Sequence, residues 1–467
     1  MACCGVSFCS TQPTMKNLLA LIALLMCVPL HAQCWQAIAT GNAHSTAIRT
    51  DGTLWAWGYN EYGQLGDGTV TEKLIPTQVG TDTDWLKIFA GSFNTFAIKI
   101  DGSLWAWGRN ANGSLGIGTV FNSTVPLQVG TDNNWAALSS GYDHTIALKN
   151  DGTLWGWGNN ARGELGNGTT TNLMYPAQIG EEANWAVIET GANYTAAIKT
   201  NGTLWQWGFN PYANLGNGLA QAVMVPTQFG TATNWATVAL GEHHTLAIKT
   251  DGTLWGWGWN IDGQLGNGVN TDVQLFTQIG TDANWRVLSA GFDSTLALKT
   301  NNTLWAWGNN SNGELGNGTT QNSNVPVQVG NGTTWQHIAT RGIHALALKQ
   351  DNGLWAFGGN HYGEIGNDTR INTSTPVIVN CTSLGLDDMD TKSHFIVYPN
   401  PVGDVLHLNN TNGFAVERLV VTDLSGKTVI QMSGNTKQVD TYRLQAGMYL
   451  LELYGGGNVF RAKFIKK

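Results

Sequence analysis

Short apolar runs separated by turn residues fill most of the chain, and the 50 residues that begin at Trp85 show their pattern. Four runs in this stretch are rich in aromatic and β-branched side chains, a composition that favours strands. They are residues 85–90, 95–100, 103–108 and 125–129. Pro126 makes the fourth run an edge strand, because proline cannot donate a ladder hydrogen bond. We therefore expect four antiparallel strands and no amphipathic helix.

The third run is apolar on both of its faces. Trp105 and Trp107 point to one side of the strand, and Leu104 and Ala106 point to the other. A sheet of this kind is typically buried between two neighbouring sheets.

The turn before that run is Asp101-Gly102, which predicts a two-residue type I′ turn with positive φ at both central residues. In two other copies of the turn asparagine stands in place of glycine, at Asn302 and Asn352. Asparagine is the side chain that best tolerates positive φ, so the substitution supports a tight turn.

The same pattern returns along the chain with a strict period of 50 residues. The segment from Asp51 to Gly58 has six further copies, which begin at Asp101, Asp151, Asn201, Asp251, Asn301 and Asp351. A tryptophan marks the start of each unit, at Trp35, Trp85, Trp135, Trp185, Trp235, Trp285 and Trp335. A period of this length indicates a solenoid or a propeller. The first unit is no more polar than the others, whereas an open solenoid needs polar end units, so we expect an all-β, seven-bladed β-propeller.

Composition and charge narrow the range of functions that this chain can have. Of the 467 residues 42% are hydrophobic and 12% are charged, with 21 tryptophans, which argues against disorder. The formal net charge is −8, and the repeats contain no basic cluster. A dedicated nucleic-acid-binding protein normally shows a basic stripe, so we expect no nucleic-acid partner.

Residues 1–32 have the organisation of an export signal. Lys16 provides a basic start, residues 18–28 form an apolar run, and a short cleavage motif precedes Gln33. We expect translation to begin at Met15, since the preceding residues do not resemble a signal sequence. The apolar run is too short to span a bilayer, so we expect no transmembrane segment.

The use of cysteine agrees with export. Four of the six cysteines lie before the expected cleavage site, which leaves Cys34 and Cys381. Superposition of the units places Cys381 on the position of Thr81 and Cys34 on that of Asp84. In a closed ring these positions are three residues apart, close enough for a disulfide in an oxidising compartment. The alternative is two unrelated thiols.

The repeat resembles a known family. Its consensus is Gly-x-x-His-Thr-x-Ala-x-Lys-Thr-Asp-Gly-Thr-Leu-Trp-x-Trp-Gly-x-Asn-x-x-Gly-x-Leu-Gly-x-Gly, and residues 241–268 supply every term. This resembles the RCC1 repeat, named for the regulator of chromosome condensation, over residues 35–379. Departures from the pattern are Ala213, Arg341, Phe357 and Ile365. The resemblance implies a seven-bladed propeller, here residues 33–381, that presents its loops to a protein partner.

The remaining residues differ in composition. Residues 382–394 form a polar linker, and residues 395–467 carry Tyr398-Pro399-Asn400-Pro401 and two spaced apolar motifs. This part resembles the C-terminal sorting domain of the type IX secretion system of Bacteroidetes, and short strands between turns predict a small β-sandwich. The resemblance implies recognition by that secretion machinery, cleavage of the tail, and an extracellular or outer-membrane-surface location.

No catalytic or metal-binding constellation stands out. His44, His144, His244 and His344 recur at one repeat position, but they are spread around the ring, and we interpret them as structural. Glu164, Glu314 and Glu364 share one loop position and form no pair that acid–base chemistry requires. The glycines of Gly63-x-x-Gly66-x-Gly68 recur without a following helix, so we interpret them as turns. We expect no cofactor and no enzymatic activity.

The loop after each Trp-Gly varies between units and is rich in residue types that dominate binding hot spots. As repeat-equivalent residues these would gather on one face of the ring: Tyr59, Tyr62, Arg109, Arg162, Phe209, Tyr212, Trp259, His361 and Tyr362. The plain alternative is that they only pack on neighbouring loops. Our first hypothesis is a recognition module that binds a protein, and the second is a carbohydrate-binding surface protein that uses Trp259. The third, guanine-nucleotide exchange, follows from the family name alone and conflicts with export.

Overall fold

A computed structural model describes residues 34–381, 395–398, 401–410, 416–423, 427–434, 436–455 and 458–467. The expected signal peptide (residues 1–32), the start at Met15, the new N-terminus at Gln33 and the linker (residues 382–394) lie outside the described residues. Tertiary contacts divide the chain into two compact units, Met1–Cys381 and Thr382–Lys467.

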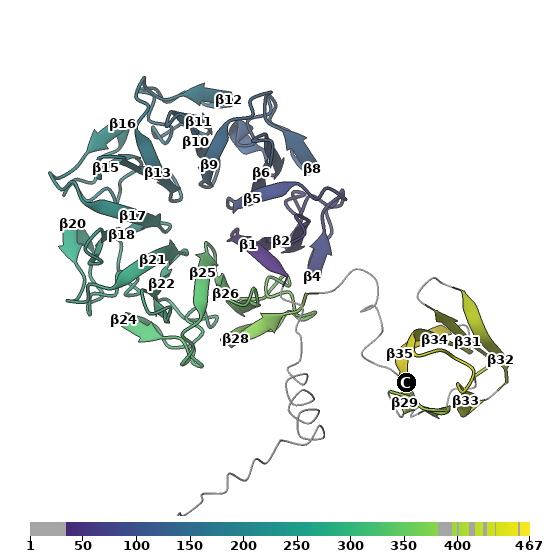
Figure 1. Ribbon diagram of the computed structural model, residues 1–467. Helices are drawn as coiled ribbons and strands as arrows, with labels where there is room; N and C mark the ends of the chain where they lie inside the picture. The colour runs from purple at the N-terminus through teal and green to yellow at the C-terminus, as the bar shows by residue number, and fades with distance from the viewer. Residues whose placement is uncertain are drawn as a thin grey trace, which may run out of the picture. The chain divides into compact units, whose positions relative to one another are not determined.

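Seven four-stranded antiparallel sheets surround a central axis and form a β-propeller (Figure 1). Each blade is one continuous segment whose strands follow one another from the axis outwards. The innermost strands are β1 (Trp35–Thr40), β5 (Trp85–Ala90), β9 (Trp135–Ser140), β13 (Trp185–Thr190), β17 (Trp235–Leu240), β21 (Trp285–Ala290) and β25 (Trp335–Thr340). The second strands are β2 (His44–Arg49), β6 (Asn94–Lys99), β10 (His144–Lys149), β14 (Tyr194–Lys199), β18 (His244–Lys249), β22 (Ser294–Lys299) and β26 (His344–Lys349).

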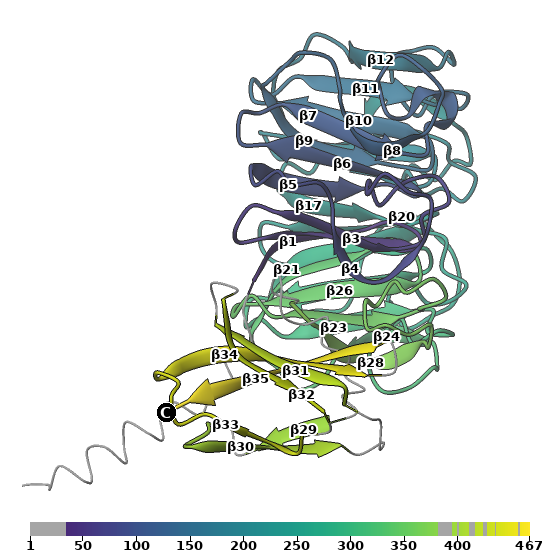
Figure 2. The same cartoon turned by 90° about the vertical axis from the view of Figure 1, so that its right-hand side faces the viewer.

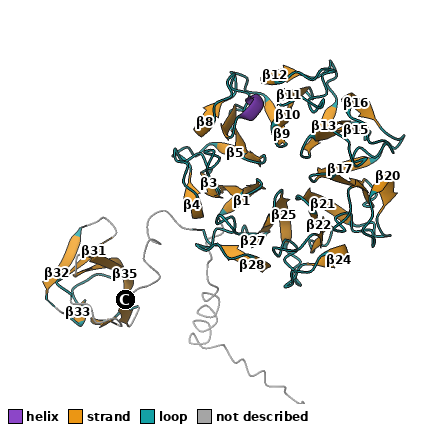
Figure 3. Cartoon of the chain, turned by 180° about the vertical axis from the view of Figure 1, so that it is seen from behind, coloured by secondary structure: helices purple, strands orange, loops and turns teal. Residues whose placement is uncertain are grey.

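The third strands carry the Trp-x-Trp motif, and the fourth form the outer rim (Figure 1). In the side view the strands run across the thickness of the propeller (Figure 2). The third strands are β3 (Leu54–Gly58), β7 (Leu104–Gly108), β11 (Leu154–Gly158), β15 (Leu204–Gly208), β19 (Leu254–Gly258), β23 (Leu304–Gly308) and β27 (Leu354–Gly358). The outer strands are β4 (Lys73–Gln78), β8 (Ser123–Gln128), β12 (Leu173–Gln178), β16 (Val223–Gln228), β20 (Val273–Gln278), β24 (Ser323–Gln328) and β28 (Thr373–Val379). In the described residues the one helical turn is η1 (Ala111–Gly113) (Figure 3).

The apolar residues of the third strand join neighbouring blades, as the two-faced pattern predicts. Trp107 is fully buried, and its indole Nε1 donates a hydrogen bond to the carbonyl of Gln64 in the preceding blade (3.0 Å). Leu104 and Ala106 are also fully buried, on the opposite face of β7. Truncation of one such indole to alanine costs roughly 3–5 kcal/mol. The core is therefore the series of interfaces between blades.

The predicted type I′ turn is wrong. Gly102 has φ +83°, but Asp101 is not among the residues with positive φ. The amide of Gly102 donates to the carbonyl of Lys99 (2.9 Å), which makes a three-residue loop with glycine in the left-handed region. The Asp101 carboxylate instead accepts hydrogen bonds from the Ser103 amide and hydroxyl. One residue of the turn needs positive φ, and Asn302 (φ 60°) fills that place as expected.

The first and last blades are each built from consecutive strands, and neither sheet contains a strand from the other end of the chain. The disulfide between Cys34 and Cys381 is present, with a Cα–Cα distance of 6.3 Å, which confirms the predicted pairing. Between the same two blades, the Ser45 hydroxyl is hydrogen-bonded to His344 Nε2 (2.9 Å) and donates to the carbonyl of Glu364 (2.8 Å). The first and last blades are thus held by one covalent bond and by the same contacts that join the other blades.

The C-terminal unit is a small β-sandwich, as predicted. One sheet contains β29 (Phe395–Tyr398), β30 (Val405–Asn410) and β33 (Gln438–Asp440), and the other contains β32 (Thr428–Ser433), β31 (Arg418–Asp423), β34 (Gly447–Gly455) and β35 (Asn458–Lys466). Buried side chains from both sheets, such as Val439 and Leu451, form its core. Within the described ranges no helix is both long and apolar enough to cross a bilayer.

Candidate binding face

One face of the propeller carries two variable turns from every blade. The first follows the innermost strand (residues 41–43 and their equivalents), and the second follows the third strand (residues 59–62 and their equivalents). A backbone hydrogen bond from the Tyr59 amide to the Ala43 carbonyl (2.8 Å) holds the two turns together, and it recurs in the other blades. We call this surface the loop face.

The longer loop is braced internally by the asparagine of the Trp-Gly-x-Asn motif. Asn60 is buried, and its side-chain amide donates to the carbonyls of Thr69 (3.1 Å) and Thr71 (3.0 Å). Its carbonyl oxygen accepts from the Leu65 amide (3.0 Å). The side chains at the tip of the loop are therefore presented from a rigid frame.

Four aromatic rings from three blades meet on the loop face. Tyr59 lies 4.7 Å from Tyr362 and 6.1 Å from Tyr62, between ring centroids, and Tyr62 lies 5.5 Å from Phe93. We call Tyr59, Tyr62, Phe93 and Tyr362 the aromatic cluster. Each such pair is worth about 0.5–1.5 kcal/mol beyond the area it buries. Tyr362 is 39% exposed, so the cluster remains accessible.

A cavity of about 280 Å³ opens beside the aromatic cluster. Tyr59, Phe93, Tyr362 and His361 form part of its wall. Asn42 and Phe292 also line it, and both line a second, smaller pocket on the axis. The cavity and the axial pocket therefore adjoin one another.

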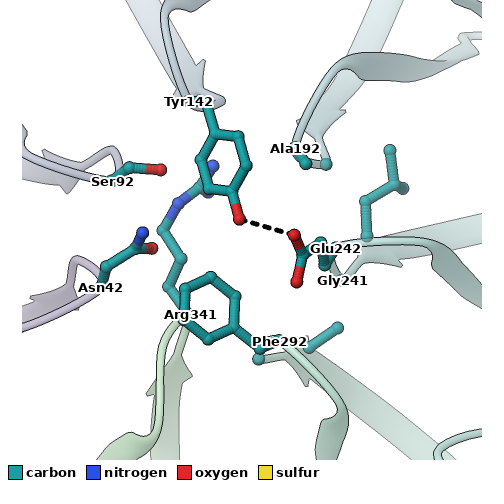
Figure 4. Close-up of a pocket in the computed structure, with 12 residues that line it drawn as sticks. Asn42, Ser92, Tyr142, Ala192, Gly241, Glu242, Phe292 and Arg341 are labelled. Carbon is teal, nitrogen blue, oxygen red and sulfur yellow. Dashed lines mark hydrogen bonds between the residues drawn. The ribbon is translucent and has the colours of Figure 1, made fainter. Parts of the chain in front are cut away.

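The axial pocket has room for about one water molecule and contains charged side chains from the fifth and seventh blades, Glu242 and Arg341 (Figure 4). Tyr142 donates a hydrogen bond to Glu242 across the opening (2.7 Å). Arg341 extends into the pocket from the seventh blade, where the other six blades have glycine. Burial lowers the Arg341 pKa to about 10, so its side chain stays protonated at neutral pH.

Glu189 of β13 lies near this charge. Burial raises its pKa to about 7, against the attraction of Arg341 and a hydrogen bond from Ser139. The axis thus holds a carboxyl group that titrates near neutral pH opposite a fixed positive charge.

Four of the other residues predicted for the binding surface form two further pairs, and Arg109 lies at the edge of the aromatic cluster. Trp259 packs on Tyr212 (4.5 Å between centroids), and Arg162 lies over the ring of Phe209 (4.1 Å). Arg109 forms an ion pair with Asp143 (2.6 Å) and reaches the ring of Tyr62. Of the nine predicted residues, the structure brings Tyr59, Tyr62, Arg109, His361 and Tyr362 to the region of the aromatic cluster and its cavity.

Sequence reasoning missed the residues of the inner turn. Phe93, Asn42, Phe292, Tyr142 and Glu242 line the cavity or the axial pocket. All occupy the two positions that follow the glycine after the innermost strand. These positions vary between blades as much as the Trp-Gly loop does, so the same reasoning applied to them would have identified the residues.

The recurrent histidines lie between blades. His44 is buried, and its Nε2 is hydrogen-bonded to the Thr95 hydroxyl of the next blade (3.0 Å). Burial lowers its pKa to about 3, so it is neutral in the folded protein. Glu164 is also buried, and its carboxylate accepts from the Arg162 amide within its own loop (2.8 Å). The described residues contain no group of three potential metal ligands in suitable positions.

Comparison with known proteins matches each of the two parts of the chain to a known family. The family described as RCC1-like domain matches residues 11–335, and the family described as secretion system C-terminal sorting domain matches residues 396–467. Over 57 residues the chain is 39% identical to the ultraviolet-B receptor UVR8 of Arabidopsis thaliana, which is 11% of this chain and 13% of the receptor.

Two solved structures share the propeller fold. Human WBSCR16 has a TM-score of 0.65 at 19% identity, over 72% of this chain and 96% of WBSCR16. Prp20p of Saccharomyces cerevisiae, whose structure was described with its binding to Gsp1p and histones, has a TM-score of 0.61 at 22% identity, over 68% of this chain and 84% of Prp20p. Likeness at these identities establishes the fold alone.

Proposed function

Because the chain belongs to the RCC1-like family of β-propellers and ends in a secretion-system sorting domain, we propose that it is an exported, non-enzymatic module that binds a protein partner. The type IX sorting tail directs the propeller to the cell surface or the extracellular space. Exchange of guanine nucleotide on a cytosolic GTPase is not part of the proposal, because an exported chain does not meet one.

The observation that carries the proposal is the aromatic cluster beside its 280 Å³ cavity. Clustered, partly exposed tyrosines with an arginine nearby have the composition of a binding hot spot. Tyrosine supplies a large rigid contact area with little loss of side-chain entropy, which suits protein recognition. The braced loops hold these rings in place before a partner arrives, which lowers the entropic cost of binding.

The test is affinity capture from the host's outer-membrane and culture fractions, followed by a binding measurement with the purified partner. The variant Tyr59→Ala/Tyr362→Ala removes two rings of the aromatic cluster. Tyr175→Ala is the matched control, because Tyr175 is an exposed tyrosine on the outer strand β12. We expect the double variant to bind at least about thirtyfold more weakly, the effect of losing two hot-spot contacts. The control should bind like the native protein.

Two results would contradict the proposal. In one, no protein binds the native chain with higher affinity than it binds the double variant. In the other, capture is abolished by enzymatic removal of glycans and by Trp259→Ala but not by the tyrosine changes, which favours the carbohydrate hypothesis. Turnover of any substrate by the purified chain would overturn its description as non-enzymatic.

A further inference from the structure

The cavity beside the aromatic cluster has a buried carboxyl group in its wall. Glu364 lines this cavity and is fully buried. Its Oε2 accepts a hydrogen bond from the Tyr362 amide (2.8 Å), but its Oε1 has no hydrogen-bond partner among the described residues. A buried acceptor without a partner costs free energy until a ligand or a water molecule satisfies it. The wall of the cavity therefore has an acceptor available for a ligand.

The equivalent glutamates have a partner for this oxygen. In the sixth blade Glu314 Oε1 accepts a hydrogen bond from the side-chain amide of Asn312 (2.8 Å), and the seventh blade has Tyr362 at that position. In the third blade Glu164 Oε1 accepts from the side-chain amide of another asparagine of its loop (3.2 Å), and the seventh blade has glycine at that position. The free oxygen is therefore specific to the seventh blade and is not part of the common packing of the repeat.

The charges around this cavity favour a cationic ligand. Burial raises the pKa of Glu364 to about 7, and the hydrogen bonds that oppose this rise come from backbone amides of its own loop. A cation beside the carboxyl group would stabilise its ionised form. Glu61 adds a second carboxylate at the edge of the aromatic cluster, where it accepts a hydrogen bond from the Tyr59 hydroxyl.

Two arginines near the cavity already have acidic neighbours. Arg109 forms an ion pair with Asp143 (2.6 Å). Arg341, in the adjoining axial pocket, is attracted by Glu189. Neither arginine is among the groups that shift the pKa of Glu364. The Glu364 carboxylate is therefore left to be neutralised by a ligand.

The aromatic wall also suits a cation, because the faces of aromatic rings attract positive charge. Tyr59, Phe93 and Tyr362 line the cavity, and the ring centroid of Tyr59 lies 4.7 Å from that of Tyr362 and 6.1 Å from that of Phe93. The side-chain oxygen of Asn42, in the same wall, is buried and has no hydrogen-bond partner within the described ranges. The volume of about 280 Å³ is just below that of typical small-molecule sites, which suits one long side chain.

The free oxygens distinguish lysine from arginine. A guanidinium group pairs best with both oxygens of a carboxylate, but one oxygen of Glu364 is already used by the Tyr362 amide. A lysine ammonium is a compact charge with three donors and needs no such pair. On the basis of the proposed function, we propose that this cavity binds a lysine side chain of the protein partner, with the ammonium at Glu364 and the methylene groups against the rings of the aromatic cluster.

The test uses the full chain and three small probes, with binding followed by saturation-transfer-difference NMR at pH 8, where the Glu364 carboxyl is mostly ionised. The probes are the Nα-acetyl N-methylamides of lysine, arginine and norleucine, the last of which resembles lysine without its ammonium. We expect the lysine probe to bind with roughly millimolar affinity. The other two should bind at least about tenfold more weakly, because each lacks the ammonium that matches the free oxygen.

Glu364→Gln removes the charge and should weaken binding of the lysine probe at least about tenfold. Tyr362→Asn restores the donor found in the sixth blade and removes one ring, so it should have the same effect. Gln64 occupies the equivalent position in the first blade and accepts from the Tyr62 amide (3.0 Å), so Glu364→Gln is expected to fold, as circular dichroism will check. Glu314→Gln is the matched control, because Glu314 has the same repeat position but does not line the cavity, and affinity should be unchanged.

Three results with the probes would overturn the lysine site. They are no binding of the lysine probe, equal binding of the norleucine or arginine probe, and native affinity in Glu364→Gln. A protein partner that binds Glu364→Gln as tightly as the native chain, yet is lost from Tyr59→Ala/Tyr362→Ala, would also overturn it and leave the proposed function intact. Binding of the lysine probe by a chain that captures no protein would instead support the lysine site and contradict the proposed function.

Discussion

The disulfide between Cys34 and Cys381 is the one covalent link between the two ends of the propeller among the described residues, and its removal is the sharpest test of how the ring is held. The change is Cys34→Ser/Cys381→Ser in the full chain. Every blade is a continuous segment, so no shared strand takes over the role of the lost bond. The contacts of Ser45 with His344 and Glu364 remain and keep the two blades in register.

The magnitude follows from the length of the closed loop. The two cysteines are 347 residues apart in sequence. Loop-closure entropy for a cross-link of this span gives about 6 kcal/mol at 25 °C, as an upper limit, because real unfolded chains are more compact than the ideal chain. Removal of native disulfides typically costs about 2–5 kcal/mol. We therefore expect the free energy of unfolding to fall by about 2–6 kcal/mol, with most of the effect in the unfolded state.

The assay is guanidinium unfolding followed by fluorescence of the 21 tryptophans, which are spread over all seven blades. The midpoint should fall and the m-value should rise, because the unfolded chain without the cross-link exposes more surface. Cys34→Ser alone should behave like the double variant, since either change breaks the same bond. A midpoint within error of the native value would refute the reasoning, and so would a single variant much milder than the double one.

Three further predictions concern charge, a turn and the tail. Burial raises the pKa of Glu189 from 4.5 to about 7 in the folded protein, so the protonated side chain contributes stability below its unfolded pKa of 4.5, and this contribution is lost as the pH rises through 7. Glu189→Gln should therefore raise the free energy of unfolding by up to about 3 kcal/mol near pH 8 and leave it unchanged near pH 4. Urea titration at both pH values will check this. Gly102→Ala places a Cβ 2.0 Å from the Asn133 carbonyl oxygen, at a residue with φ +83°. Thermal unfolding should show that this variant is about 1–3 kcal/mol less stable than the native protein. Asn302→Gly in the equivalent turn should change stability by less than about 0.5 kcal/mol. A chain of residues 33–383 should unfold cooperatively yet fail to reach the cell surface of its host, as calorimetry and surface immunoblotting will show; normal export of this chain would contradict the role given to the tail.

The repeat allowed the fold to be predicted almost completely. A strict 50-residue period shows which residues are equivalent. The strand from Leu104 to Trp107 is apolar on both faces, which indicates that each sheet lies between two others. The same equivalence placed Cys34 beside Cys381. The turn at Asp101 was mispredicted because the dipeptide suits two turn types, and the carboxylate contacts with Ser103 accompany the one observed.

The candidate site could be predicted only in part. Variation between repeats identifies loop positions such as Tyr59 and Tyr362, but the period cannot say which varied residues from different blades touch. That depends on side-chain direction and on the turn after the innermost strand, which supplies Phe93.

The continuity of each blade has a consequence for the order of the chain. Since no sheet is assembled from both ends and the Cα atoms of Cys34 and Cys381 lie 6.3 Å apart, a short peptide could join the two ends directly. The chain could then begin at any of the segments that connect one blade to the next, and every sheet and every contact between blades would be retained. The propeller is thus a circle of equivalent units in which the first blade is set by the position of the termini and not by the packing.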